Sequence, residues 1–175
     1  MKIFSLFLGA NAFKHRFQMQ NARAHRDDQY LNTKMSLTQK LGDGDFFITA
    51  VTPLFDEKVH HMIIKGCTDD VHHTRDATEH VNCDGSQIIF SWAMSAGQLE
   101  FPPGAGIHVS GRSGIRSIAI EAHYKDAFHG IDNLTGVELE FTSEPPQKTV
   151  GIYLLASATF QPGMKIIQND ILMIL

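Results

Sequence analysis

Two adjacent histidines, His60 and His61, interrupt the apolar run VHHMIIKGC at residues 59–67. Imidazole is the commonest side-chain ligand of metal ions and suits copper, zinc, iron and nickel. The chain holds ten histidines but one tryptophan, an enrichment that adds modest support. A pair of histidines within a run of apolar residues therefore indicates a metal site.

The element that carries this pair must also position it. The run is typical of a strand, and successive side chains of a regular strand point to opposite faces of the sheet. His60 and His61 therefore reach one ion only if a bulge, a twist or the end of the strand turns one of them toward the other. Bulges are common beside active sites for this reason.

The run at residues 115–124 offers a third ligand. His123 lies on its more polar face, and Glu121 beside it is a candidate acceptor that would orient an imidazole. The opposite face consists of Ile118, Ile120, Ala122 and Tyr124. Three imidazoles with an open position suit zinc or copper by ligand chemistry alone.

The chain has two cysteines, Cys67 and Cys83. If the chain is secreted, the two pair, and the closed loop stabilises the fold by ~3 kcal/mol in the chain-entropy model. A blue-copper site would instead need Cys67 as a thiolate beside two histidines, which a bonded sulfur cannot supply. Asn133 begins an Asn-Leu-Thr acceptor sequence for N-glycosylation, which agrees with secretion.

Composition narrows the class of protein. A chain of 175 residues with 43% hydrophobic and 19% charged residues is long enough for one globular domain with a core. A net charge of −4 with scattered basic residues argues against nucleic acid as a partner. No apolar run reaches the ~18 residues of a membrane span. Residues 1–12 form either a short secretory signal peptide or a buried terminal strand.

Short apolar runs separated by glycine and proline turns predict an all-β fold, an antiparallel two-sheet β-sandwich of jelly-roll type. We expect residues 13–44 to form a polar leader with one strand near 30–37, and GRSG at 111–114 to form a hairpin turn. The polar loop at 68–82 contains histidines that we expect to be solvated. Further strands are expected near residues 45–51, 59–66, 87–94, 107–110, 115–124, 137–141, 150–160 and 165–167.

Several motifs resemble one family when they are taken in order. VHHMIIKGC at 59–67 resembles the N-terminal signature of the copper type II, ascorbate-dependent monooxygenases, a family that includes peptidylglycine and dopamine monooxygenases. The resemblance covers residues 29–171 and implies their N-terminal β-sandwich domain. It continues at FSWA (90–93), PGAG (103–106), GRSG (111–114), EAHY (121–124), GIYL (151–154) and PG (162–163).

The resemblance implies roles for individual residues. His60, His61 and His123 correspond to the ligands of the copper that receives electrons from ascorbate and passes them to a second copper. Tyr30 falls where the family has a tyrosine near this copper. The GIYL stretch is closer to the peptidylglycine branch, which implies a glycine-extended peptide as substrate, whereas Glu121 is closer to the dopamine branch.

The chain also departs from the family pattern. Asn32 and Leu134 stand where the resemblance implies cysteines. Family members continue into a second domain, which holds the oxygen-activating copper through a His-x-His pair and a methionine, and we expect that domain to be absent here. Two interpretations stay open: the electron-transfer domain of a secreted or lumenal monooxygenase, or a catalytically incomplete copper-binding module or truncated relic. A zinc-binding sandwich is a lesser variant.

Overall fold

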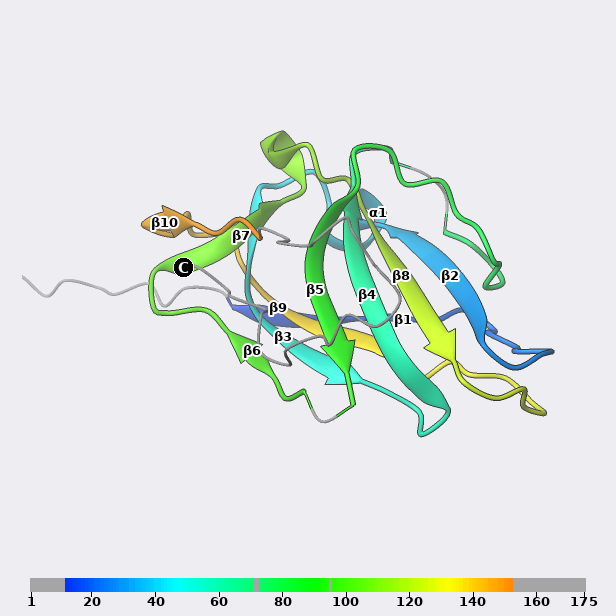
Figure 1. Ribbon diagram of the computed structural model, residues 1–175. Helices are drawn as coiled ribbons and strands as arrows, with labels where there is room; N and C mark the ends of the chain where they lie inside the picture. Colours follow the sequence, from blue (N-terminus) through cyan, green and yellow to red (C-terminus); the bar gives the residue numbers. More distant parts are fainter. Residues whose placement is uncertain (1–11, 71–72, 95, 153–175) are drawn as a thin grey trace, which may run out of the picture.

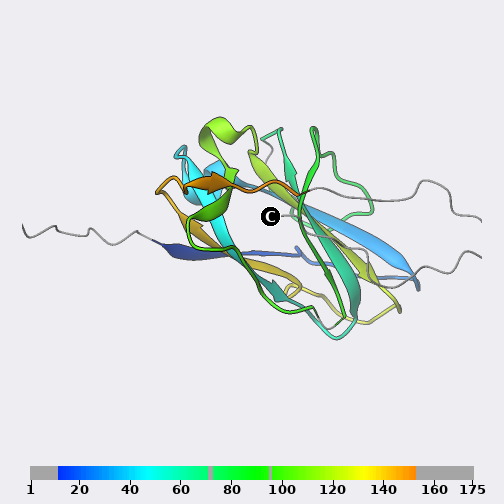
Figure 2. The same cartoon turned by 60° about the vertical axis from the view of Figure 1, so that its left-hand side comes forward.

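Two β-sheets packed face to face form the protein (Figures 1 and 2). The computed structural model describes residues 12–70, 73–94 and 96–152. One sheet has six strands, in the order β1-β9-β3-β7-β10 with β6 also paired to β3, and the other has the order β2-β8-β4-β5. The strands are β1 (Phe13–Gln18), β2 (Gln29–Ser36), β3 (Phe46–Leu54), β4 (Val59–Cys67), β5 (Gln87–Ala93), β6 (Leu99–Glu100), β7 (Ala105–Val109), β8 (Ser117–Tyr124), β9 (Gly136–Thr142) and β10 (Lys148–Thr149). The predicted all-β sandwich is confirmed.

The chain passes between the two sheets at most of its connections, including the one between β7 and β8. The prediction of a hairpin at 111–114 is therefore wrong, because β7 and β8 belong to different sheets. The segment instead contains the short 3-10 helix η1 (Gly111–Ser113). A hairpin turn and a connection between two sheets can have the same glycine-rich sequence. The sequence alone therefore does not distinguish them.

Of the polar leader predicted at 13–44, the strand near 30–37 is confirmed as β2, but the rest is not irregular as expected. It contains β1, whose Lys14 and Arg16 pair across the sheet with Glu140 and Glu138 of β9. The Arg16–Glu138 hydrogen bond joins residues 122 positions apart, a partner that local patterning does not reveal. The helix α1 (Leu37–Leu41) follows β2, with the Ser36 side chain accepting a hydrogen bond from the Gln39 amide. Five residues are too few to show a helical period.

Other boundaries differ less. β3 continues through Pro53 to Leu54 instead of ending at residues 52–53. The signal peptide proposed at 1–12 and the strand proposed at 165–167 lie almost or wholly outside the described residues. Of the strand proposed at 150–160, the structure describes residues 150–152, which are not in a strand. None of the helices in the described part of the chain is long and apolar enough to span a membrane.

The core lies between the sheets. Ile118, Ile120, Ala122 and Tyr124 are completely buried on the inner face of β8, as the alternation predicts. They form one core with residues of the opposite sheet, among them Phe17, Ile48, Leu139 and Phe141. A fully buried isoleucine, leucine or phenylalanine side chain contributes about 1.5–3 kcal/mol. Because these residues occupy the inner face of β8, His123 lies on the outer face of the sheet.

The described parts of the segment between β4 and β5, residues 68–70 and 73–86, lie along the outer side of the four-stranded sheet at β2 and β8. A disulfide joins Cys67, the last residue of β4, to Cys83 within this segment, with the Cα atoms 4.9 Å apart. The segment pairs with the free edge of β2 through a bridge between Asn32 and Thr78. Lys34 is 1% exposed, forms an ion pair with Asp69, and donates to the Asn82 carbonyl at 2.7 Å. The edge of the sheet at β2, which would otherwise have unpaired backbone groups, is therefore covered.

Removal of this disulfide tests how much the segment depends on it. The bond closes a loop across 16 positions, so a Cys67→Ala/Cys83→Ala variant should lose ~3 kcal/mol of unfolding free energy. Urea denaturation measures the loss. Lys14→Gln/Glu140→Gln removes an ion pair with an exposed lysine and should change the unfolding free energy by less than ~1 kcal/mol. An unchanged midpoint in the cysteine variant would contradict the expectation.

Asp45 stabilises the connection between β7 and β8, which passes from one sheet to the other. Its carboxylate accepts hydrogen bonds from the Arg112 amide at 2.8 Å and from His108 Nε2 at 2.9 Å. These bonds, led by that of the Arg112 backbone, lower the pKa of Asp45 to about 2. Because the folded pKa lies below the unfolded value of ~3.9, the ionised form favours the folded state.

The sign of this shift gives a pH dependence. The contribution of Asp45 should be complete above about pH 4 and should disappear as the pH falls toward the folded pKa of about 2. An Asp45→Asn variant should therefore be less stable than the wild type at neutral pH, and the difference should shrink on acidification. Unfolding free energies measured by denaturant titration at pH 7, 4 and ~2 check this. A difference that is constant with pH would contradict it.

Candidate metal centre

A bulge in β4 brings the two adjacent histidines to the same side of the sheet. In the pairing of β4 with β8, Val59 lies opposite Tyr124 and His61 opposite His123, with a register shift between Val59 and His61. His60 is the extra residue, so His60 and His61 together face His123. Val59 and Met62 on either side are buried, which keeps the strand in the sheet. Of the three ways in which His60 and His61 could be turned toward one ion, the structure therefore shows a bulge.

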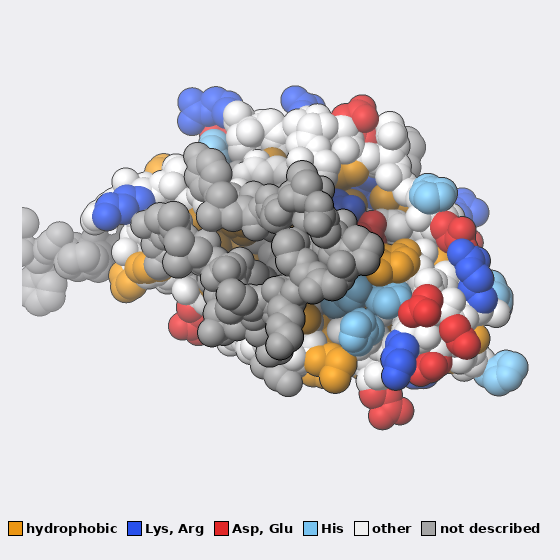
Figure 3. Space-filling model, viewed as in Figure 1, with side chains coloured by type: hydrophobic (Ala, Val, Ile, Leu, Met, Phe, Trp, Pro, Cys, Tyr) orange, Lys and Arg blue, Asp and Glu red, His pale blue; other side chains and the backbone are white. Residues whose placement is uncertain are grey.

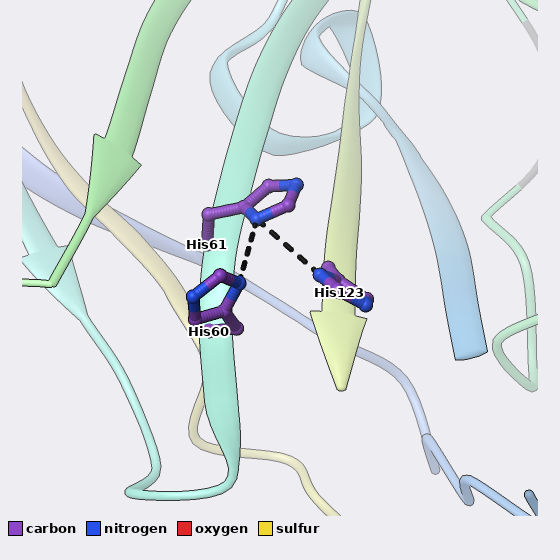
Figure 4. Close-up of side chains that lie close together, drawn as sticks. All are labelled: His60, His61 and His123. Carbon is purple, nitrogen blue, oxygen red and sulfur yellow. Dashed lines mark hydrogen bonds between the residues drawn. The ribbon is translucent and has the colours of Figure 1, made fainter. Parts of the chain in front are cut away.

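The three imidazoles converge (Figure 4). His61 Nδ1 lies 3.3 Å from His60 Nδ1 and 3.3 Å from His123 Nδ1. One nitrogen from each residue lies within 4.8 Å of the others. Two nitrogens that bind one ion at ~2.0–2.1 Å with a near-tetrahedral angle are ~3.3 Å apart. The spacing of the Nδ1 atoms therefore fits a shared metal ion, and the ligand set fits copper or zinc.

Exposure differs among the three residues. His123 is 7% exposed, His61 is half-buried and His60 is exposed. Burial lowers the pKa of His61, and the nearby His123 and His60 lower it further. The neutral imidazole, which is the form that binds metals, is therefore favoured at His61. Figure 3 shows histidine side chains gathered at the surface of this face, bordered by hydrophobic and charged side chains.

Tyr30 lies against the cluster. It is opposite His123 in the pairing of β2 with β8. Its ring stacks on that of His123 with centroids 4.2 Å apart and planes 3° apart, and it meets His61 edge-on at 5.8 Å. The tyrosine is 43% exposed, so one edge of the stack reaches solvent. Tyr30 therefore lies directly beside the three histidines.

Glu121 is placed differently from the expectation. Its carboxylate forms an ion pair with Lys65 at 3.0 Å. The carboxylate that contacts His123 belongs to Asp28, whose Oδ1 lies 3.3 Å from His123 Nε2. Asp28 was not predicted from the sequence, although its position two residues before Tyr30, in the turn just before β2, is a usable signal. Glu121 acts on His61 only through its charge, which partly opposes the lowering of the pKa.

Other histidines lie apart from this group. His108 binds Asp45, and among the described residues His60, His61 and His123 form the one cluster of three or more potential metal ligands. His80 is exposed, as expected for the polar loop, whereas His73 Nδ1 accepts a hydrogen bond from the Ser36 amide at 3.3 Å. His72 lies outside the described residues.

Comparison with known proteins agrees with this geometry. Residues 15–129 match the family model described as "Copper type II ascorbate-dependent monooxygenase, N-terminal domain". The chain belongs to this family. The match contains the bulge, the three histidines and the disulfide.

Individual relatives lead to the same family. The chain is 33% identical over 125 residues to peptidyl-glycine alpha-amidating monooxygenase B of Xenopus laevis, an alignment that covers 66% of the chain and 14% of that protein. It is 27% identical over 172 residues to the Rattus norvegicus enzyme, covering 94% of the chain and 17% of the relative. Tyramine beta-hydroxylase of Caenorhabditis briggsae is 26% identical over 101 residues, covering 53% of the chain and 17% of the relative. The chain therefore spans less than a fifth of the length of these relatives.

Proposed function

We propose that this chain is the copper-binding, electron-transfer domain of a copper- and ascorbate-dependent monooxygenase. The observation that carries the proposal is the convergence of His60, His61 and His123 at a strand bulge, in a chain of this family. Three neutral imidazoles bring no charge into the site, so the same ligands serve both Cu(I) and Cu(II). Copper held there would accept and donate single electrons, one ion per chain.

The protein contributes position and access. The buried His123 is held on β8 by its neighbour Tyr124, whose hydroxyl donates to Asp132 Oδ2 at 2.8 Å inside the core. The exposed His60 leaves one side of the cluster open to a reductant. We propose ascorbate as that reductant, because the family's description names it.

We further propose that the whole enzyme hydroxylates the α-carbon of a peptide's C-terminal glycine. Relatives from Xenopus laevis and Rattus norvegicus, named for peptidyl-glycine alpha-amidation, support this substrate class. The oxygen-activating step is assigned to a second copper, held by another domain or chain.

We propose a secreted or lumenal location for the protein. The Cys67–Cys83 disulfide supports this location, because disulfides persist in oxidising compartments. Asn133 is exposed, as a glycosylation acceptor must be, and its side chain accepts a hydrogen bond from the Asn21 amide at 2.6 Å.

Copper titration tests the site itself. The purified chain should bind one Cu(II) with a type II EPR signal, and ascorbate should bleach that signal by reducing the ion. His123→Ala removes the most buried ligand and should abolish this binding. His129→Ala is the matched control, because His129 is exposed and not part of the cluster, and it should bind like the wild type. One Cu(II) with an unchanged spectrum in His123→Ala would count against the site.

Turnover tests the enzymatic part of the proposal. The copper-loaded chain should be mixed with ascorbate, a glycine-extended peptide and the remaining catalytic domain of the Xenopus laevis relative. Mass spectrometry should detect a peptide product that has gained one oxygen atom, and His123→Ala should reduce its formation to the rate of the added domain alone. Intact copper binding without any such product would leave a catalytically incomplete copper-binding module.

A further inference from the structure

We propose that Asp28 is a positioning residue for the metal centre, acting through His123 to set the relative stability of the two copper oxidation states. The inference rests on the proposed function. His123 Nδ1 points to the other histidines, and its second ring nitrogen, Nε2, lies 3.3 Å from Asp28 Oδ1. When Nδ1 binds the metal, Nε2 carries the proton and donates a hydrogen bond to this carboxylate.

The backbone at Asp28 holds the carboxylate in place. Asp28 has a left-handed backbone with φ 53°, a conformation that aspartate and asparagine adopt more readily than most residues. Its amide donates to the Lys125 carbonyl at 3.0 Å. Lys125 lies two residues beyond His123, so the turn before β2 is fastened to the end of the strand that carries the ligand.

His123 is thereby constrained from three directions. Tyr30 covers one face of the ring, Asp28 accepts a hydrogen bond from Nε2, and Nδ1 is left to face His61. The side chain of Asp28 is 80% exposed, so it contributes little to the core. Its contact with the ligand is therefore separable from a general structural role.

The chemical effect follows from the negative charge. A carboxylate that accepts a hydrogen bond from Nε2 increases the electron density at Nδ1, which strengthens binding of Cu(II) more than of Cu(I). Asp28 should therefore lower the reduction potential of the bound copper. Loss of its charge should raise that potential. The rise should be ~59 mV for each factor of ten by which the Cu(II) affinity falls more than the Cu(I) affinity.

Asp28→Asn tests the inference, because asparagine retains the size and tolerates the left-handed backbone. In the full chain, Cu(II) affinity should fall by ~10–100-fold and Cu(I) affinity by less. The reduction potential should rise, while the thermal unfolding of the metal-free protein stays unchanged. Asp27→Asn is the matched control: Asp27 lies in the same turn, but its carboxylate binds the Ala127 amide at 2.9 Å, and its removal should leave both affinities and the potential unchanged.

The outcomes separate this inference from the proposed function. A wild-type chain that binds no copper at the three histidines overturns both. A wild-type chain that binds copper, together with an Asp28→Asn variant of unchanged affinities and potential, overturns the inference alone. An equal shift of the potential in Asp27→Asn would overturn it too, since a general field of negative charge would then explain the effect.

Discussion

The register shift between β4 and β8 is the constraint on which the cluster of His60, His61 and His123 depends. A regular pair of strands sets one residue against one, and would place His60 and His61 on opposite faces of the sheet. The bulge sets both against His123, so that three imidazoles meet on one face. The conformation of the backbone, more than any single side-chain contact, thus brings the three imidazoles close enough together to share a metal ion.

A bulge is stable only where the surrounding sheet prevents the strand from slipping back into register. Slippage by one residue would expose the completely buried Met62 and Ile64 and carry His61 into the core. On the other side of β8 from β4, the described residues between Cys67 and Cys83 contact the edge of β2 at Asn32 and Lys34. The core therefore fixes the register of β4. The contacts at Asn32 and Lys34 hold β2, the strand that pairs with β8 on the side away from β4.

The sequence predicts the fold class and the three histidines because both depend on local information. Alternation in β8 is visible in the sequence, and so is the His-His pair that requires a bulge. What stayed hidden depends on distant partners: β1 is recognisable only beside β9, and the turn at 111–114 is a crossing only because β7 and β8 join different sheets. Asp28 and Glu121 show the same limit, since which carboxylate reaches His123 is decided by a loop fastened to Lys125.

The gradient of exposure across the cluster suits a site that exchanges electrons without performing the chemistry on the substrate. A fully buried site would need an entry path for the reductant, and a fully exposed one would let the ligands move as the ion changes charge. Here His123 is buried and held by Asp28 and Tyr30, while His60 faces solvent. With the proposed copper bound, rigid ligands on one side would limit the rearrangement between its oxidation states, and an open ligand on the other side would admit an electron donor. The bulge produces this asymmetry, because it adds the exposed His60 to a pair of residues already fixed by the sheet.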